Sequence, residues 1–545
     1  MIDWLRHLPI LPILLPLAAG TAMLFLGESR RTLRAAIALC STFLQLAAAI
    51  ALLGMAGGIF PDVWPEGIAV YLLGGWRAPF GIVLVADRLA AVMLALTAVL
   101  ATASLLYSLA RWDRLGVHFH PLFQFLLMGI NGAFLTGDLF NLFVFFEVLL
   151  AASYGLMLHG SGAPRVKAGL HYIAVNLAAS FLFLIGVALI YGVSGTLNMA
   201  HLAVRFPQLQ GGDRVLCELG TAILGVAFLV KAGAWPLNFW LPAAYGTAAA
   251  PVAAVFSITT KVGVYALLRL TALLSEAGTT APFDTGWLWP IGLATLAFGS
   301  VAMLTAQQPQ QLTSYSVLVS SGTLLAALGL GDAGMVGPTL FYLISSVLTT
   351  GAFFLLSEMI ERSRPFGANI LAVTFESFGV EEPLDPDRPD EVVGTVIPAA
   401  MAFLGLAFIS CALLVTGLPP LSGFVAKFWM LSAALGWPSA GTPTASAWVL
   451  TAAVLASGLV GIVALSRMGT RIFWGASERI KPRLRVIEAG PVAFLVLLCA
   501  ALAVQAGPVT DYLGATGNSL YTPRTYIDAV LSASPMGQPV PGAQP

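Results

Sequence analysis

Charged residues are scarce in this chain of 545 residues: Asp, Glu, Lys and Arg make up 10% of it, whereas hydrophobic residues make up 58%. Soluble domains carry about 25% charged residues, so the composition excludes an ordinary soluble protein and predicts a multi-pass membrane protein. The 26 basic and 26 acidic residues cancel to a net charge of zero, which gives no indication of a nucleic-acid partner. The N-terminal segment lacks the pattern of a cleavable signal peptide, and we expect it to form the first membrane span.

The chain also lacks the motifs of metal, redox and nucleotide chemistry. Its four cysteines are each isolated in or beside an apolar stretch, which argues against a metal site or a disulfide framework. It has no Gly-rich phosphate loop and no haem-attachment motif. We therefore expect no cofactor and no metal centre. All six histidines lie within the first 201 residues; of these, His159 and His171 flank an inside loop, where we expect them to be solvated.

Apolar segments of about 20 residues, the length that crosses a bilayer as a helix, predict an all-α protein with about 14 transmembrane helices. We expect these helices near residues 8–27, 32–54, 83–110, 119–136, 139–158, 168–192, 215–246, 250–274, 286–306, 311–331, 335–358, 395–435, 446–466 and 487–509. The segments 215–246 and 395–435 are too long for one straight span and contain Pro236 and the pair Pro419 and Pro420. We expect each to be one broken helix with an unwound middle; division of each into two spans is the alternative.

Basic residues test this count, because Lys and Arg concentrate in cytoplasmic loops. With the N-terminus outside, sixteen of the 26 basic residues fall in inside loops and seven in outside regions or outer helix ends. The other three, Lys231, Lys261 and Lys427, lie within predicted spans. We therefore expect both termini outside, an acidic cytoplasmic loop at 359–394, and a flexible tail rich in Pro, Gly and Ser at 510–545.

The two predicted broken helices occupy corresponding places, the fourth in helices 4–8 and the fourth in helices 9–13, counted in chain order. Because each set has five spans, the second set would enter the membrane the opposite way up, as in inverted repeats. We therefore predict a division of the chain into N-terminal helices 1–3 within 1–118, a first five-helix repeat at 119–274, a second at 286–466 with the acidic loop, helix 14 at 487–509, and the tail.

Four ionisable residues lie deep inside predicted spans: Glu147, Lys231, Lys261 and Lys427. A lysine at the bilayer centre costs ~2.5–3.5 kcal/mol on insertion scales, so such a residue is expected to have a function or a partner. Lys231 precedes the break at Pro236 and Lys427 follows the second break, where freed backbone can hold water. The plainer alternatives are lysines that extend to the membrane interface and an ion pair that fixes helix packing.

Glu147 and Lys231 belong to the same predicted repeat, so we expect them to form a pair. A lysine loads and releases protons only if its pKa falls toward the working pH, and a moving carboxylate would change its affinity for the proton. The four buried residues are therefore interpreted as a chain for proton transfer. Asp138 is expected to cap the N-terminus of a helix, and Asp87 and Arg88 to pair at the membrane interface.

Three segments carry a resemblance to a known family: DLFNLFVFFEVLLAASYGLMLHG at 138–160, KAGAWPLNFWLPAAYGTAAAPVAA at 231–254 and GLPPLSGFVAKF at 417–428. The chain resembles the antiporter-like subunits of respiratory complex I and, among them, the D subunit of the multisubunit Mrp cation/proton antiporter, over nearly its whole length. The resemblance implies fourteen helices in two inverted repeats, a hydrated row of charges along the membrane midplane, and a complex with other Mrp subunits.

The resemblance also implies a proton-transfer role for four residues: Glu147 as the carboxylate of helix 5, Lys231 as the lysine of helix 7, Lys261 as the bridging lysine of helix 8, and Lys427 as the lysine of helix 12. The chain departs from the family pattern at two places. It has Ser345 and Ser346 where relatives commonly place a histidine in helix 11, and Asn238 where a histidine often follows the helix 7 proline. The second half would then depend on water, hydroxyl groups and Tyr315.

We therefore expect a proton-translocating subunit of a monovalent cation/proton antiporter, with Na⁺ as the first candidate cation, in a bacterial inner membrane. Its expected partners are the other Mrp subunits, protons, the cation and the lipid bilayer. Ion transport, and not enzyme catalysis, would be its activity. The alternatives are a proton-pumping subunit of NADH:quinone oxidoreductase or of a membrane-bound hydrogenase, and a purely structural membrane subunit.

Overall fold

The computed structural model describes residues 3–27, 30–61, 63–116, 118–275, 285–363, 399–437, 443–474 and 484–535. In these ranges the chain is almost entirely α-helical. The helices before residue 276 are α1 Asp3–Arg6, α2 Leu11–Leu24, α3 Arg31–Ala56, α4 Arg88–Ser108, α5 Phe119–Leu135, α6 Leu139–Met157, α7 Ala163–Ser194, α8 Met199–Arg205, α9 Gly211–Ala232, α10 Trp240–Thr247 and α11 Ala250–Ser275. Those after it are α12 Leu288–Thr305, α13 Pro309–Leu328, α14 Val336–Arg362, α16 Ala399–Thr416, α17 Ser422–Ala434, α18 Ala445–Phe473, α19 Val486–Val504, α20 Ala506–Leu520 and α21 Pro523–Leu531.

A small antiparallel sheet lies between α3 and α4. Its strands are β1 (Ala69–Leu72) and β2 (Val83–Ala86), and the register pairs Ala69 with Ala86 and Leu72 with Val83. All four residues of β2 are buried, whereas β1 is half-buried along most of its length. The sheet therefore places the start of α4, including Asp87, against the interior of the helix bundle.

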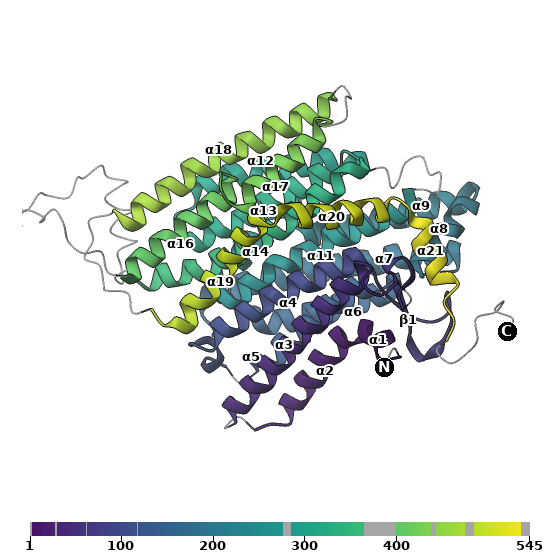
Figure 1. Ribbon diagram of the computed structural model, residues 1–545, viewed down its shortest axis with the longest axis horizontal. Helices are drawn as coiled ribbons and strands as arrows, with labels where there is room; N and C mark the ends of the chain where they lie inside the picture. Colours follow the sequence, from purple (N-terminus) through teal and green to yellow (C-terminus); the bar gives the residue numbers. More distant parts are fainter. Residues whose placement is uncertain are drawn as a thin grey trace, which may run out of the picture.

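Long apolar helices make up the bundle. Figure 1 shows them lying side by side in one direction, with α2 at one edge and α18 at the opposite edge. Eleven helices in the described ranges are long and apolar enough to cross a membrane. α11 and α14 are buried along nearly all of their length, whereas fewer than half of the residues of α3, α7 and α18 are buried. The expected all-α membrane fold is confirmed; the number of spans and the inverted repeats stay predictions.

Two helix breaks lie where the prolines predict them. α9 ends at Ala232 and helical structure resumes at Trp240, after Pro236. α16 ends at Thr416 and α17 begins at Ser422. Because a proline has no amide hydrogen and crowds the preceding turn, neither segment can continue as a regular helix.

The same backbone turn opens both breaks. Gly233 (φ 70°) and Gly417 (φ 79°) follow the last helical residues in the left-handed conformation, which costs glycine little. The amide of the next residue then donates to the carbonyl five positions back, at 3.0 Å in each case, which makes both helix ends Schellman turns. A proline follows each glycine after three residues, Pro236 and Pro420. The two breaks are therefore built from the same local elements.

The expectation of a flexible tail at 510–545 is wrong for the described residues up to 535. α20 packs across α14, and α21 packs against α8 and β1, as Figure 1 shows in yellow. Thr516, Tyr526 and Val530 are buried in these contacts. Pro523 stands in the first turn of α21, where proline is tolerated, so a Pro- and Gly-rich composition does not prevent folding here. Residues 536–545, and the acidic loop from 364 onward, lie outside the described residues.

Candidate proton-transfer site

Lys231 lies in the last turn of α9, just before the first break. Its side chain is buried, with 5% of the residue exposed. The ammonium Nζ donates to Oδ1 of Asn176 on α7 at 3.3 Å and lies 5.7 Å from the centroid of the Phe146 ring on α6. The C-terminal end of a helix carries partial negative charge, and an aromatic face attracts a cation. The charge is thus stabilised by an amide oxygen, a ring and a helix end.

Glu147 does not form the expected direct pair with Lys231. The two side chains are close enough to interact electrostatically, yet among the described residues no ion pair within 4.0 Å joins them. Consecutive helical residues point about 100° apart, and Phe146 is the residue that faces the ammonium. The Glu147 atom Oε1 is buried without a hydrogen-bond partner among the described residues. Such a group normally binds water or another donor, so this oxygen has room to accept a further hydrogen bond.

Lys261 lies in the middle of α11 and is 1% exposed. Its Nζ donates to Oγ of Ser321 on α13 at 3.0 Å. Two residues further on, Gly263 lets α11 approach α9 closely, because a Cβ at this position would lie 3.2 Å from the Cβ of Lys231. The helices that carry the first two lysines are therefore in direct backbone contact where the lysines lie.

Lys427 lies in α17, directly after the second break. Its Nζ donates to the carbonyl oxygens of Val415 at 3.1 Å and Thr416 at 2.8 Å. Both carbonyls belong to the last turn of α16, which the break leaves without intrahelical partners. The expectation that freed backbone lies beside this lysine is confirmed. Gly417 makes room for the side chain, since a Cβ there would lie 2.5 Å from Lys427 Cδ.

A cavity lined by hydroxyl groups lies among α13, α14 and the break between α16 and α17. Lys261 donates to a serine of α13 and Lys427 donates to the end of α16, so helices in contact with both lysines border the cavity. Its volume is about 20 Å³, and a cavity of roughly 10–15 Å³ already holds one water molecule. Ser320 donates to Ser346 at 2.9 Å, and Ser345 and Ser422 share a hydrogen bond of 2.8 Å. Val415, a carbonyl partner of Lys427, also lines it.

The tyrosine that lines this cavity is Tyr342 on α14, and the expected contribution of Tyr315 stays a prediction. Tyr342 is buried, whereas Tyr315 packs half-buried against apolar neighbours. Both tyrosines lie in apolar stretches with serines nearby, so the sequence alone could not choose between them. At the first break, the buried amide Nδ2 of Asn238 has no hydrogen-bond partner among the described residues, which makes it a second place suited to water.

An ion pair that sequence reasoning missed joins Asp87 to Arg269. Arg269 Nη2 donates to Asp87 Oδ1 at 2.8 Å, and its Nη1 pairs with the other carboxylate oxygen. Arg88 instead donates to the carbonyl of Ala56 at 3.0 Å, so the expected pairing of Asp87 with Arg88 is wrong. An arginine inside the apolar segment 250–274 was the available signal. The expectation that Asp138 caps a helix is confirmed, because it accepts from the amide of Asn141 at 2.9 Å.

Polar contacts also organise the end of the bundle that is predicted to face the cytoplasm. Arg362 at the end of α14 donates to Glu488 of α19 at 2.7 Å and lies 3.5 Å from Glu358. His159 is buried and its Nε2 lies 2.8 Å from the carbonyl oxygen of Trp112, so the expectation of a solvated His159 is wrong. Burial lowers the pKa of this imidazole, which favours its neutral form.

Comparisons with known proteins agree with this architecture. A family model described as NADH:quinone oxidoreductase/Mrp antiporter, TM, matches residues 136–378. A Rhizobium meliloti (strain 1021) protein, named as the D subunit of a probable K(+)/H(+) antiporter, is 54% identical over 98% of this chain and 100% of its own length. The D subunit of the Na(+)/H(+) antiporter of Alkalihalophilus pseudofirmus is 32% identical over 97% of this chain and 100% of its own.

A solved structure of the Mrp complex from Dietzia sp. DQ12-45-1b contains a chain that superposes with a TM-score of 0.78. The two chains are 26% identical, and the match covers 96% of this chain and 99% of the other. The fold is thus that of the membrane subunits shared by complex I and the Mrp antiporters. Within this class the chain belongs to the family of antiporter D subunits found in Mrp complexes, and the expected resemblance is confirmed.

The contact between Lys231 and Asn176 yields a test. Asn176→Ala removes the amide oxygen that accepts from the buried ammonium. Loss of a partner costs a buried neutral group about 1–3 kcal/mol and a charged group more. We expect antiport per assembled complex to fall severalfold in membrane vesicles. Asn518→Ala, which truncates an exposed asparagine on α20, is the matched control and should leave antiport unchanged. Equal antiport in both variants would contradict a role for Asn176 in holding Lys231.

Proposed function

We propose that this chain translocates protons as a subunit of a monovalent cation/proton antiporter in a bacterial inner membrane. The observation that carries the proposal is the setting of three buried lysines, Lys231, Lys261 and Lys427, each of which donates to neutral oxygen atoms. A buried lysine fixed by a carboxylate would serve packing. Neutral acceptors stabilise a protonated lysine without binding it as an ion pair, so the proton can leave and return.

In the first half, the route would run from Glu147 past Lys231 to Lys261. Glu147 is within electrostatic range of Lys231 without being bound to it, so a change in its charge or position would alter the lysine's affinity for a proton. The close contact of α9 with α11 at Gly263 supports transfer from Lys231 toward Lys261 through one or more water molecules.

In the second half, adjacent serines of α13 would continue the route. Ser321 accepts from Lys261, and Ser320 donates to Ser346 on α14. A hydroxyl group donates one hydrogen bond and accepts others, so it can receive a proton on one side as it releases its own on the other. Hydroxyl groups would thus take the place of the histidine that related proteins commonly carry in this helix.

The last step would lead from the serine pair of α14 and α17 to Lys427. Ser345 shares a hydrogen bond with Ser422, in the first turn of the helix that carries Lys427. Val415 lines the same cavity and accepts from the ammonium of Lys427. A single water molecule in the cavity would be enough to join the hydroxyl groups to the lysine.

The exchanged cation is proposed from the relatives' names. The relative that shares 54% of its residues is named for a probable K(+)/H(+) antiporter, whereas the one at 32% is named for a Na(+)/H(+) antiporter. This difference supports K⁺ as the first candidate and Na⁺ as the second. The partners would be the other subunits of an Mrp-type complex, because the Dietzia chain of the same fold comes from a complex of that kind.

Transport, and not enzyme catalysis, is the proposed activity. The full-length matches to antiporter D subunits support an antiporter over a component of NADH:quinone oxidoreductase, although the family model spans both groups. We also propose that 119–274 and 286–466 are inverted repeats. The identical turns at Gly233 and Gly417 support this division.

Replacement of the lysines tests the proposed function. Lys231→Ala, Lys261→Ala and Lys427→Ala should each abolish K⁺- and Na⁺-dependent proton movement in inverted membrane vesicles, because each removes a proton-carrying group. Lys167→Ala changes an exposed lysine and should leave exchange intact. The measurement is fluorescence quenching by a pH-sensitive dye, normalised to the assembled complex. Full exchange in any of the three buried variants would reject a proton-carrying role for that lysine.

Replacement of the serines tests the hydroxyl route. Ser345→Ala combined with Ser346→Ala removes two hydroxyl groups of the cavity with little change in volume. We expect exchange to slow severalfold while the amount of complex stays unchanged. Ser410→Ala on the exposed side of α16 is the control. If the double variant exchanges protons as fast as this control, the route between Lys261 and Lys427 does not use these hydroxyl groups.

A further inference from the structure

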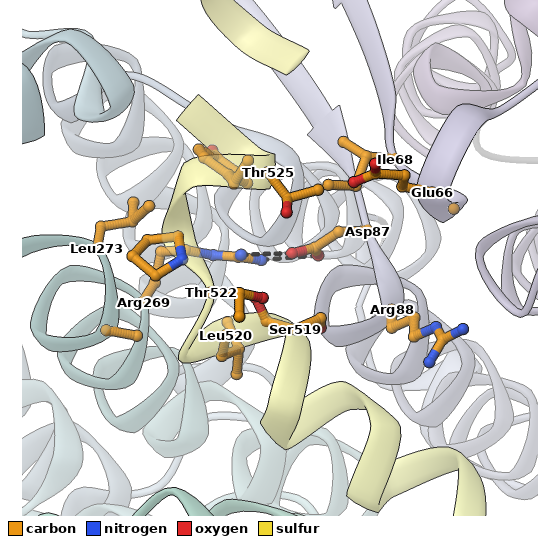
Figure 2. A pocket seen from close by; sticks show the side chains of 14 residues that line it. Glu66, Ile68, Asp87, Arg88, Arg269, Leu273, Ser519, Leu520, Thr522 and Thr525 are labelled. Atoms are coloured by element: carbon orange, nitrogen blue, oxygen red, sulfur yellow. Dashed lines mark hydrogen bonds and ion pairs between the residues drawn. The ribbon is translucent and has the colours of Figure 1, made fainter. Parts of the chain in front are cut away.

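A second cavity, of about 200 Å³, lies above the ion pair of Asp87 and Arg269. Figure 2 shows the pair at its centre, with Ser519, Thr522 and Thr525 of the C-terminal segment around it. The walls come from the turn before β1, the start of α4, the end of α11 and the segment joining α20 to α21. The distribution of basic residues places this face outside the cell.

Aromatic side chains enclose Arg269, which is only 4% exposed although it borders the cavity. The guanidinium carbon lies 5.4 Å from the ring centroid of Tyr265 and 5.3 Å from that of Tyr526. Arg269 Nη2 also donates to the hydroxyl of Tyr265 at 3.1 Å, and that hydroxyl donates to the carbonyl of Phe134 at 2.6 Å. Tyr526 belongs to α21, so the C-terminal segment supplies one side of the enclosure.

The ion pair is connected to the proposed proton route through one face of α11. Lys261, Tyr265 and Arg269 are spaced four residues apart and all three are buried. Four residues advance about 6 Å along a helix, so Arg269 lies about 12 Å along α11 from Lys261. On this face of α11, the polar group between Lys261 and Arg269 is the hydroxyl of Tyr265. The outer cavity therefore lies at the end of the α11 face that carries Lys261.

We propose that the Asp87–Arg269 ion pair is an outer gate of the proton route and that Tyr526 keeps it closed. The proposal rests on the proposed proton transfer through Lys261. In the closed state Arg269, which stays protonated, occupies both carboxylate oxygens of Asp87, so this carboxylate cannot accept a proton from the cavity. When Arg269 moves away, the carboxylate of Asp87 faces the cavity and can accept a proton.

The position of Tyr526 fits a closing element. α21 contacts the short helix α8 and strand β1 and lies at the rim of the bundle. The hydroxyl of Tyr526 reaches the loop before α6, where a Cβ on Gly137 would lie 3.3 Å from it. The side chain is thus wedged between this loop and Arg269. Its withdrawal with α21 would open the enclosure on one side without disturbing the long helices.

Passive proton entry into vesicles without K⁺ or Na⁺ tests the gate. Tyr526→Ala should raise this leak severalfold per assembled complex, because water reaches Arg269 and the pair can separate. Tyr526→Phe keeps the ring and should stay tight. Tyr191→Ala is the control, since Tyr191 is an exposed tyrosine on α7 and lies outside the cavity lining. The leak should disappear when Lys261→Ala is added to Tyr526→Ala.

Arg269→Gln provides the second variant, because it removes the positive charge while keeping a polar side chain that can still donate hydrogen bonds. The gate predicts a leak in this variant as well. An ion pair that merely anchors α4 to α11 predicts less assembled complex and no leak per complex, and that result in both variants would overturn the gate. A leak that persists with Lys261→Ala would also overturn it. Full exchange in Lys261→Ala alone would instead reject the proposed function, so the two failures are distinguishable.

Discussion

The structure depends on how a positive charge is accommodated inside an apolar bundle. Among the described residues, the ammonium groups of Lys231, Lys261 and Lys427 donate to an asparagine amide, a serine hydroxyl and two backbone carbonyls, with no carboxylate within 4.0 Å of any of them. Neutral oxygens offset part of the desolvation of a buried charge, whereas a carboxylate in contact would hold the proton on the lysine. This constraint explains the second helix break, since a regular helix has no free carbonyl to offer at mid-length and Lys427 donates to two carbonyls of the last turn before that break. It also explains two glycines. Gly263 lets α11 approach the helix that carries Lys231, and Gly417 leaves room for the side chain of Lys427.

The rest of the bundle arranges these lysines in one interior. α11 and α14, the most deeply buried of the long helices, carry Lys261 and the serine pair at 345 and 346. α13 packs against both of them, with Ser320 and Ser321 on its buried surface. A serine hydroxyl within a helix commonly donates to the carbonyl of its own helix. Ser320 donates to a neighbouring helix instead and Ser321 accepts from Lys261. The central helices thus combine tight packing with a row of polar groups that crosses from one broken helix to the other.

Sequence reasoning predicted the parts of this site that depend on local chemistry. The buried lysines stand out because charge is rare in apolar spans, and both helix breaks follow from glycine and proline, which act within a few residues. The contacts made by these side chains could not be predicted in the same way. Whether Phe146 or Glu147 faces Lys231 depends on the rotation of α6 within the bundle, and Asp87 finds its partner 182 residues away. The helices at 506–531 were missed because their stability comes from packing on α14, α8 and β1, which composition does not reveal.

The most direct test of the account is Lys231→Arg in the assembled complex, measured as cation-dependent proton uptake into vesicles across a range of pH. Arginine keeps the positive charge, the contact with an amide oxygen and the aromatic face, but it stays protonated at every working pH. If Lys231 acts by releasing and rebinding a proton, the arginine variant should assemble normally and exchange no more protons than the alanine variant does. If arginine restores exchange to the level of the unaltered complex, the charge is structural, and the account of a proton route through the buried lysines is wrong.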